Sequence, residues 1–254
     1  MPNPNIFYAI TVFIFGLIMG SFYNVVIYRV PNHQSIVYGS SHCPNCEKTI
    51  QAIDLIPVLS FIFLKGKCRY CKQTIAWRYP LVELLTALLF TLVYLRYGYS
   101  LYTSLGIIMS SLLIIIAFID IDTMEISDTL QILLLIIALC TLFISPLPWL
   151  DHLIGLFIIS LPFLLIALIT GAMGGGDIKL IAVGGLLLGY QAVLVAFFIA
   201  SVSGGIYASY LLIFKHKGRK TMVAFGPFIC LGIYFAYLYG FQLYTLYLSL
   251  FIKG

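Results

Sequence analysis

Charged residues are scarce in this chain: they make up 9% of its 254 residues, while hydrophobic residues make up 62% and the mean hydropathy is +1.07. Soluble domains carry about 25% charged residues, so this composition excludes a soluble globular protein. Because backbone groups inside a bilayer must be hydrogen-bonded within the chain, the long apolar runs predict an all-α polytopic membrane protein. The net charge of +5 is small and scattered, which excludes a nucleic-acid-binding surface.

Histidine is also rare. The four histidines are His33, His42, His152 and His216, and no H-E-x-x-H sequence is present. None of the four lies near the acidic loops described below, which excludes a catalytic zinc site of the metalloprotease type and a histidine-based nucleophile.

The chain has no glycine-rich nucleotide fingerprint. It also lacks internal repeats, which are typical of transporters.

Eight apolar runs are candidates for membrane-spanning helices, which need about 20 residues each. They cover residues 6–28, 81–95, 101–119, 129–144, 153–170, 178–188, 192–214 and 224–252. The sixth run is short and rich in glycine. We expect the first run to be an uncleaved helix, because no basic region precedes it. Its Gly16 and Gly20 form a small-residue face suited to close packing against another helix.

The orientation follows from the basic residues. Residues 29–80 form the one long polar segment and hold seven of the fourteen lysines and arginines. If this segment is cytoplasmic, the same side receives Lys179 and a basic cluster at 215–220, and only Arg96 and Lys253 remain outside. The positive-inside rule therefore predicts an external N-terminus, a cytoplasmic polar segment and an external C-terminus.

The predicted organisation has three parts. Residues 1–28 form a first transmembrane helix, 29–80 a cytoplasmic cysteine-containing segment, and 81–254 a seven-helix membrane domain. On this topology two acidic loops, one at 120–128 and one at Asp177, face the cytoplasm together.

Four of the six cysteines form two C-x-x-C pairs in the polar segment: Cys43 with Cys46, and Cys68 with Cys71. Four thiolates at this spacing predict a closed, structural zinc site, whose metal folds a segment that has little core of its own. Disulfides are the alternative, but a reducing cytosol argues against them. His33 and His42 are alternative ligands, although solvated loop histidines are the simpler interpretation. Cys140 and Cys230 lie in apolar runs, where we expect small packed side chains.

The first acidic loop places four acids in nine residues: Asp120, Asp122, Glu125 and Asp128. A purely structural loop on the cytoplasmic side would normally carry basic residues. The alternative is a solvated acidic turn, and for Asp128 we prefer a role as N-cap of the next helix. Asp122 and Glu125 stay undecided. Asp120 directly follows an apolar run and is expected to be the most buried.

The second acidic site, Asp177, follows three glycines at 174–176 and lies between two apolar runs. We expect the glycines to allow a tight turn and the close approach of another segment. An ionisable group at a bilayer edge indicates function, with a loop that dips into water as the alternative. Two close carboxylates cannot both ionise, so one activates a water and the other polarises an amide. The pattern predicts aspartyl proteolysis with Asp120 and Asp177 as catalytic residues.

These residues resemble the motifs of the type IV prepilin leader peptidases, membrane aspartyl proteases of the GxGD kind, over nearly the whole chain. The matching segments are residues 20–31 (GSFYNVVIYRVP), the two C-x-x-C pairs, 56–60 (IPVLS), 78–83 (RYPLVE), 174–180 (GGGDIKL) and 224–228 (AFGPF). Asp120 holds the position of the family's first catalytic aspartate, and Asp177 that of the GxGD aspartate. One departure is Ser127, where the family usually has proline, and it puts the rigidity of the loop in doubt.

The resemblance implies a protein of the bacterial cytoplasmic membrane that cuts short, basic leaders from type IV prepilin or pseudopilin precursors, usually after a glycine. An acidic cytoplasmic loop fits a cationic leader. Many such enzymes then methylate the new N-terminal amine with S-adenosylmethionine. The expected cofactors are thus structural zinc and S-adenosylmethionine, and the expected partners are the precursors and the lipid bilayer.

The methyl-donor site is not assigned. Asn24, Arg29 and Glu83 are candidates for it, with structural roles at helix ends as the alternative. Two other functions stay open: a transporter with functional carboxylates in the membrane, and a zinc-dependent membrane assembly scaffold that would tolerate loss of both aspartates.

Overall fold

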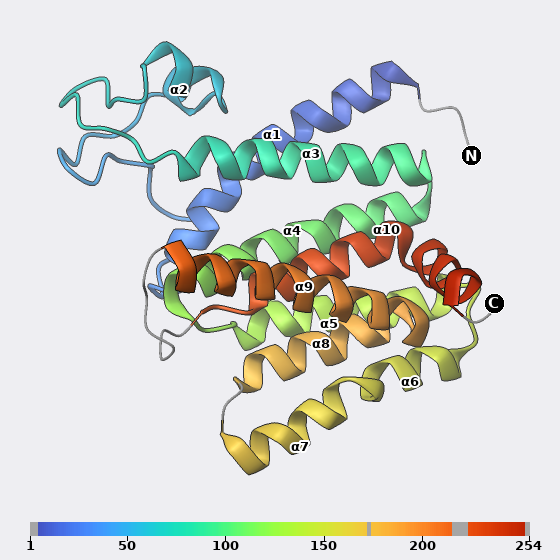
Figure 1. Ribbon diagram of the computed structural model, residues 1–254. Helices are drawn as coiled ribbons and strands as arrows, with labels where there is room; N and C mark the ends of the chain where they lie inside the picture. The colour runs from blue at the N-terminus through green and yellow to red at the C-terminus, as the bar shows by residue number, and fades with distance from the viewer. Residues whose placement is uncertain (1–4, 172–173, 215–222, 252–254) are drawn as a thin grey trace. The chain divides into compact units, whose positions relative to one another are not determined.

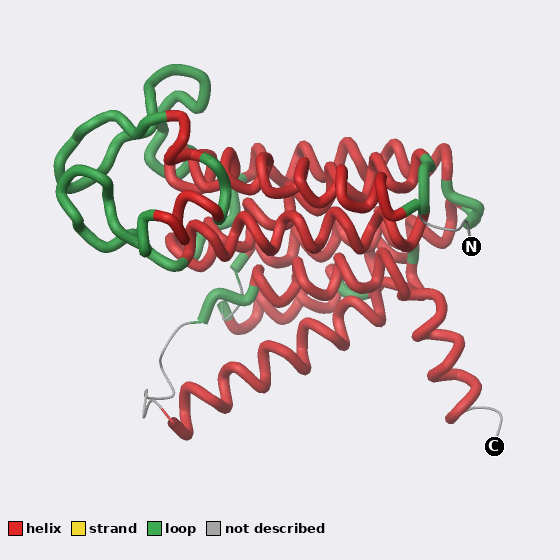
Figure 2. Tube along the Cα trace, turned by 90° about the horizontal axis from the view of Figure 1, so that it is seen from above, coloured by secondary structure: helices red, strands yellow, loops and turns green. Residues whose placement is uncertain are grey.

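A computed structural model describes residues 5–171, 174–214 and 223–251. The described residues are helical apart from loops and two isolated β-bridges, which confirms the all-α class (Figure 2). His216, Lys253 and the basic cluster at 215–220 lie outside the described residues. The chain divides into two compact units, residues 1–115 and 116–254, and each is described by itself.

Six helices are long and apolar enough to cross a membrane. They are α1 (Ile6–Arg29), α3 (Arg78–Tyr97), α4 (Leu101–Thr123), the pair α6 (Trp149–Ile158) and α7 (Ser160–Thr170), α9 (Tyr190–Phe214) and α10 (Gly226–Phe251). The expected count of about eight is not confirmed, because α5 (Asp128–Ile144) and α8 (Gly175–Leu188) have only 17 and 14 residues. At 1.5 Å per residue they are about 26 and 21 Å long, whereas the hydrocarbon core is about 30 Å thick.

The run predicted at 153–170 is broken in the middle. Ile159 separates α6 from α7 and has φ of −108°. Pro162 has no N–H to offer the carbonyl of Ile158, and a proline ring clashes with that carbonyl, so the helix is interrupted one turn before the proline. Glycines end three helices: Gly98 ends α3, Gly171 ends α7 and Gly189 ends α8, each with positive φ.

In the first unit, α1 packs closely on α3 through its glycines. A Cβ at Gly16 would lie 2.5 Å from the Cα of Ala87, and one at Gly20 would lie 2.6 Å from the Cα of Glu83. No other residue fits at these two positions, because the obstructing atoms are backbone. The expected close packing of this face is confirmed.

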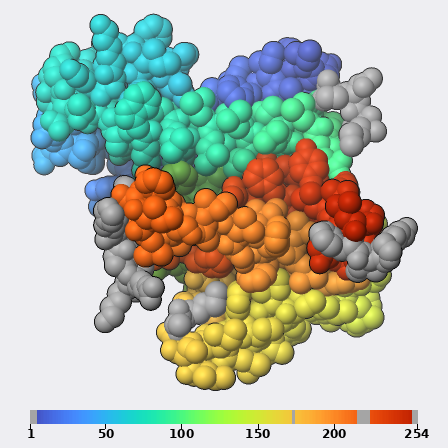
Figure 3. All heavy atoms as spheres, viewed as in Figure 1, coloured from blue at the N-terminus to red at the C-terminus, as the bar shows by residue number. Residues whose placement is uncertain are grey.

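The polar segment between α1 and α3 contains η1 (Ala52–Leu55) and α2 (Leu59–Phe63). The bridges His42–Thr49 and Lys67–Thr74 each close a short hairpin around one C-x-x-C pair. In Figure 3 this segment, coloured light blue to cyan, forms a lobe of atoms next to α3.

In the second unit, the short helix α8 is central. It contacts α5, α6, α7, α9 and α10, and nine of its fourteen residues are buried (Figure 1). Cys230 on α10 is buried as expected, but Cys140 on α5 is exposed, so the prediction of a packed side chain there was wrong. Hydropathy cannot distinguish the inner face of an apolar helix from the outer one.

Candidate active site and metal centre

Asp120 lies in the last turn of α4 and is 4% exposed. Its Oδ2 accepts a hydrogen bond from the N–H of Gly226, at 3.0 Å. Gly226 is the first residue of α10, so the carboxylate faces the positive end of a helix dipole and one of its unpaired N–H groups. A Cβ at Gly226 would lie 2.6 Å from the same oxygen. The glycine in the 224–228 motif therefore lets α10 approach Asp120.

Asp177 lies in the first turn of α8 and is half-buried. Of the three glycines before it, only Gly176 is tightly packed, because its Cβ would lie 3.1 Å from the Cβ of Ile126. Gly174 has φ of −68°, and a Cβ at Gly175 would meet nothing within 4 Å. The close approach is thus confirmed for Gly176, and Gly175 and Gly176 form the start of α8 without a positive φ.

The two aspartates lie near each other, although 57 positions separate them in the sequence. Their carboxylates interact electrostatically with each other, and both interact with the buried thiol of Cys230. Ile126 lies against both approaching glycines, Gly176 and Gly226, at 3.1 Å from each ideal Cβ. Ile126 therefore packs between the backbone at Gly176, directly before Asp177, and the backbone at Gly226, whose N–H donates to Asp120.

The other acids of the first loop differ from Asp120, because Asp122, Glu125 and Asp128 are all exposed. Asp128 is the first residue of α5 and not its N-cap, which corrects our expectation. Ser127 holds the extended N-cap conformation, and the helix starts one residue later. Asp128 accepts a hydrogen bond from Lys179 Nζ at 2.8 Å and so links the two loops. Both side chains are well exposed, so this ion pair contributes little stability.

Gln131 on α5 was not singled out by the sequence analysis. Its Nε2 donates to the carbonyl of Gly176 at 3.3 Å, and the side chain is 4% exposed. Its Oε1 is buried and has no hydrogen-bond partner among the described residues. Gln131 thus holds the peptide directly before Asp177. The available signal was a strongly polar side chain inside the apolar run 129–144.

The four cysteines of the polar segment come together. The sulfur atoms of Cys43, Cys46, Cys68 and Cys71 lie within 4.8 Å of one another, and all four are free thiols. The sulfurs of Cys43 and Cys71 are 3.8 Å apart, which matches the separation of about 3.8 Å that a tetrahedral zinc with Zn–S of about 2.3 Å requires. His33 and His42 are exposed and lie outside this cluster. The donor set fits a structural zinc.

The two C-x-x-C pairs share one local geometry. In each, the N–H of the first cysteine donates to the carbonyl five residues later, that of Lys48 or of Gln73. Hydrogen bonds from the Gln73 N–H and the Asn45 side chain lower the pKa of Cys71 to about 6. The backbone N–H groups of Cys46 and Asn45 also lower the pKa of Cys43. One cysteine of each turn thus favours the thiolate, which is the form that binds zinc, whereas burial and the neighbouring thiols raise the pKa of Cys46 to about 11.

Comparison with known proteins gives two matching family models, the bacterial peptidase A24 N-terminal domain over residues 14–97 and the type IV leader peptidase family over residues 107–209. A prepilin leader peptidase/N-methyltransferase of Bacillus subtilis is 40% identical over 94% of this chain and 97% of the relative. One of Aeromonas salmonicida is 34% identical, covering 95% of this chain and 94% of its own length. One of Neisseria gonorrhoeae is 36% identical, covering 84% of each chain. No solved structure matches the chain significantly.

Proposed function

This chain belongs to the type IV leader peptidase family, and on that premise we propose that it is a membrane aspartyl endopeptidase. Its substrates are type IV prepilin or pseudopilin precursors, from which it removes the leader peptide. The observation that carries the proposal is the meeting of Asp120 and Asp177 beside the N-terminus of α10.

The two carboxylates form the catalytic dyad. Since like charges in a partly buried site repel, the pair holds one proton between its members. The ionised member takes a proton from a water molecule, which attacks the scissile carbonyl, and the protonated member polarises that carbonyl or protonates the leaving amine. The Gly226 N–H keeps Asp120 oriented, and the Gln131 amide holds the peptide before Asp177. These two contacts support the assignment of roles.

The acidic loop favours a basic leader. Asp122 and Glu125 are exposed beside the dyad residue Asp120, within the same short stretch of chain. Exposed carboxylates at the mouth of a site raise the local concentration of a cationic peptide. Leader recognition by charge is therefore part of the proposal.

The active site faces the cytoplasm of a bacterial inner membrane. This placement rests on the excess of basic residues in the 29–80 segment and on the positive-inside rule. The segment holds the four-cysteine cluster, and free thiolates and zinc–thiolate sites are typical of a reducing compartment. The N-terminus is placed outside the cell.

A second reaction follows cleavage in this proposal, namely N-methylation of the new N-terminal amine. The named relatives carry both activities in their names, and they cover nearly the whole of this chain. S-adenosylmethionine is the proposed methyl donor.

Co-expression with a prepilin precursor, followed by mass spectrometry of the product, tests the first reaction. We expect wild type to shorten the precursor, Asp120→Asn and Asp177→Asn each to leave it intact, and both variants to insert and fold normally. Asp151→Asn, the same change in the first turn of α6, is the matched control and is expected to cleave. Substantial cleavage by either Asp120→Asn or Asp177→Asn would contradict the assignment of the two aspartates as the catalytic dyad. An intact precursor with wild type would instead favour a transporter or a scaffold.

A further inference from the structure

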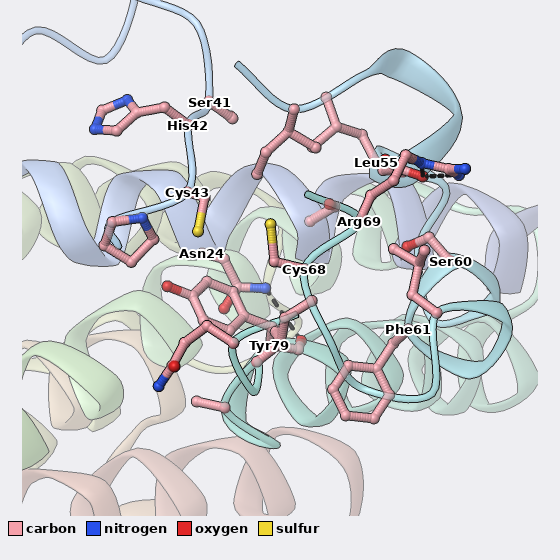
Figure 4. Close-up of a pocket in the computed structure, with 18 of the residues that line it drawn as sticks. Asn24, Ser41, His42, Cys43, Leu55, Ser60, Phe61, Cys68, Arg69 and Tyr79 are labelled. Atoms are coloured by element: carbon pink, nitrogen blue, oxygen red, sulfur yellow. Dashed lines mark hydrogen bonds and ion pairs between the residues drawn. The ribbon is translucent and has the colours of Figure 1, made fainter. Parts of the chain in front are cut away.

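A pocket of about 440 Å³ lies in the first unit, between α1, α3 and the cysteine segment (Figure 4). This volume falls within the range of about 300–1,000 Å³ that small-molecule sites occupy. The residues singled out from the sequence as candidates for a methyl-donor site, Asn24, Arg29 and Glu83, all line it. Cys43 and Cys68 bound one side, so the pocket adjoins the candidate metal centre (Figure 4).

Three cationic side chains line the pocket, and all three are already engaged. Lys48 Nζ lies over the Tyr70 ring, 4.9 Å from its centroid. The guanidinium of Arg29 donates to the carbonyls of Ser35 and Tyr38 at 2.9 Å, and to that of Gly39 at 3.0 Å. Arg69 forms a two-pronged pair with Asp54, with N–O distances from 2.6 to 3.2 Å (Figure 4). Arg29 therefore has the structural role at a helix end that the sequence left as its alternative. Neither arginine is available to neutralise a carboxylate elsewhere in the pocket.

Glu83 is the carboxylate of this pocket that forms no ion pair among the described residues. Its side chain is 8% exposed, its Oε2 accepts the N–H of Val58 at 2.7 Å, and the Ser21 hydroxyl also hydrogen-bonds to it. In the part of the chain that the structure describes, no lysine, arginine or histidine forms an ion pair with it. A buried carboxylate without a cation is costly, so the part of the wall around Glu83 favours a positively charged group of a ligand.

The remaining lining suits an aromatic, hydrogen-bonding ligand. Asn24 uses its Nδ2 to donate to the carbonyl of Tyr79 at 3.1 Å, and no described residue donates to its Oδ1 (Figure 4). The rings of Tyr28, Phe61 and Tyr70 also line the pocket and supply aromatic surface. Lys48 lies over the Tyr70 ring, and Phe61 packs against Trp77.

We propose that this pocket binds the methyl donor, S-adenosylmethionine, with Glu83 facing its cationic part. The proposal rests on the proposed function, since methylation is what calls for such a donor. S-adenosylmethionine combines a sulfonium and an ammonium charge with an adenine ring; Glu83 complements the positive charge, and Asn24 with the aromatic rings complements the adenine. When bound, it supplies an electrophilic methyl group. Glu83 and Asn24 hold it, and the tyrosine and phenylalanine rings enclose it.

Equilibrium binding of labelled S-adenosylmethionine to the purified full-length protein in detergent tests the assignment. We expect saturable binding by wild type and at least a tenfold higher Kd for Glu83→Gln. Glu47→Gln is the matched control, because Glu47 is exposed in the same segment and does not line the pocket. It is expected to change Kd by less than twofold.

Photo-crosslinking of the donor to wild type gives a readout that does not depend on how any variant folds. The expected adduct lies within residues 21–83. An adduct confined to residues 116–254, equal Kd values for the two glutamate variants, or no saturable binding would each overturn the proposal. If the protein binds the donor with this pattern but cleaves no prepilin, the donor-binding pocket is supported and the peptidase assignment is contradicted. If the protein cleaves prepilin but does not bind the donor, the peptidase assignment is supported and the donor-binding pocket is contradicted.

Discussion

Gly226 has a role that depends on its lack of a side chain. It donates its N–H to Asp120, and any Cβ would fall 2.6 Å from the accepting oxygen. Since the carboxylate and the helix terminus both belong to the proposed active site, the glycine determines how Asp120 is aimed. The same kind of contact recurs at Gly176 against Ile126, directly before Asp177.

Gly226→Ala is therefore expected to lower the rate of leader cleavage at least tenfold. The added methyl group forces Asp120 or the start of α10 to shift, at a cost of about 1–3 kcal/mol in the free energy of unfolding. Cleavage assays and thermal unfolding of the purified protein measure the two effects. Gly205→Ala is the control, because a Cβ at Gly205 meets nothing within 4 Å. Equal cleavage rates for the two variants would contradict the role assigned to Gly226.

Gln131→Leu is expected to lower kcat several-fold while KM and stability stay nearly constant. The change removes a hydrogen bond to Gly176, worth about 1 kcal/mol, but it also removes a buried acceptor that lacks a partner. The two effects offset each other in stability, whereas only the first one loosens the peptide before Asp177. Gln191→Leu removes another buried, unpartnered amide oxygen on α9 and should leave kcat unchanged. A rise in KM with kcat unchanged would refute a positioning role for Gln131.

At the scale of elements, the two C-x-x-C hairpins act as a pair. Each is closed by a single β-bridge, and the residues after the pairs, Glu47 and Lys72, have left-handed φ values of 55° and 60°. Such short hairpins bury little apolar surface, so they need a cross-link to stay folded. The ion pair of Arg69 with Asp54 ties the second hairpin to η1.

Metal removal should therefore act on the stability of this segment. We expect one zinc per chain in the purified wild type, and loss of zinc with a lower Tm in Cys43→Ser. Leader cleavage by the folded fraction of the variant should change much less, because the dyad lies on other elements. Cys140→Ser, an exposed cysteine outside the cluster, controls for the substitution itself. Elemental analysis that finds no zinc in wild type would argue against the metal centre.

At the scale of the whole molecule, orientation in the membrane decides which compartment supplies the substrate. Asp120 ends one helix and Asp177 begins another, and the two carboxylates interact. The chain must therefore leave this end along α5 and return along α6 and α7. The two shorter helices, α5 and α8, contact each other in the second unit.

Cysteine accessibility in intact cells tests the proposed orientation. In a Cys140→Ser background, Tyr99→Cys should react with a membrane-impermeant thiol reagent, because Tyr99 is 99% exposed in the loop between α3 and α4. Met124→Cys, in the acidic loop where Met124 is 52% exposed, should react only after the cells are opened. The reverse pattern would place the dyad outside the cell.

The amino-acid sequence by itself determined the membrane class, the approximate positions of the helices and the four-cysteine cluster, and it led to the proposal of Asp120 and Asp177 as catalytic residues. These follow from properties of short windows, namely apolar runs, the spacing of cysteines and isolated acids, and such properties act locally. Only the tertiary structure decided that the aspartates meet, that Gly226 faces Asp120 and that Gln131 holds Gly176. It also decided that α5 and α8 are short and that Cys140 is exposed. The Gly226 contact joins residues 106 positions apart, and contacts of this kind depend on how whole helices pack, which no local pattern encodes.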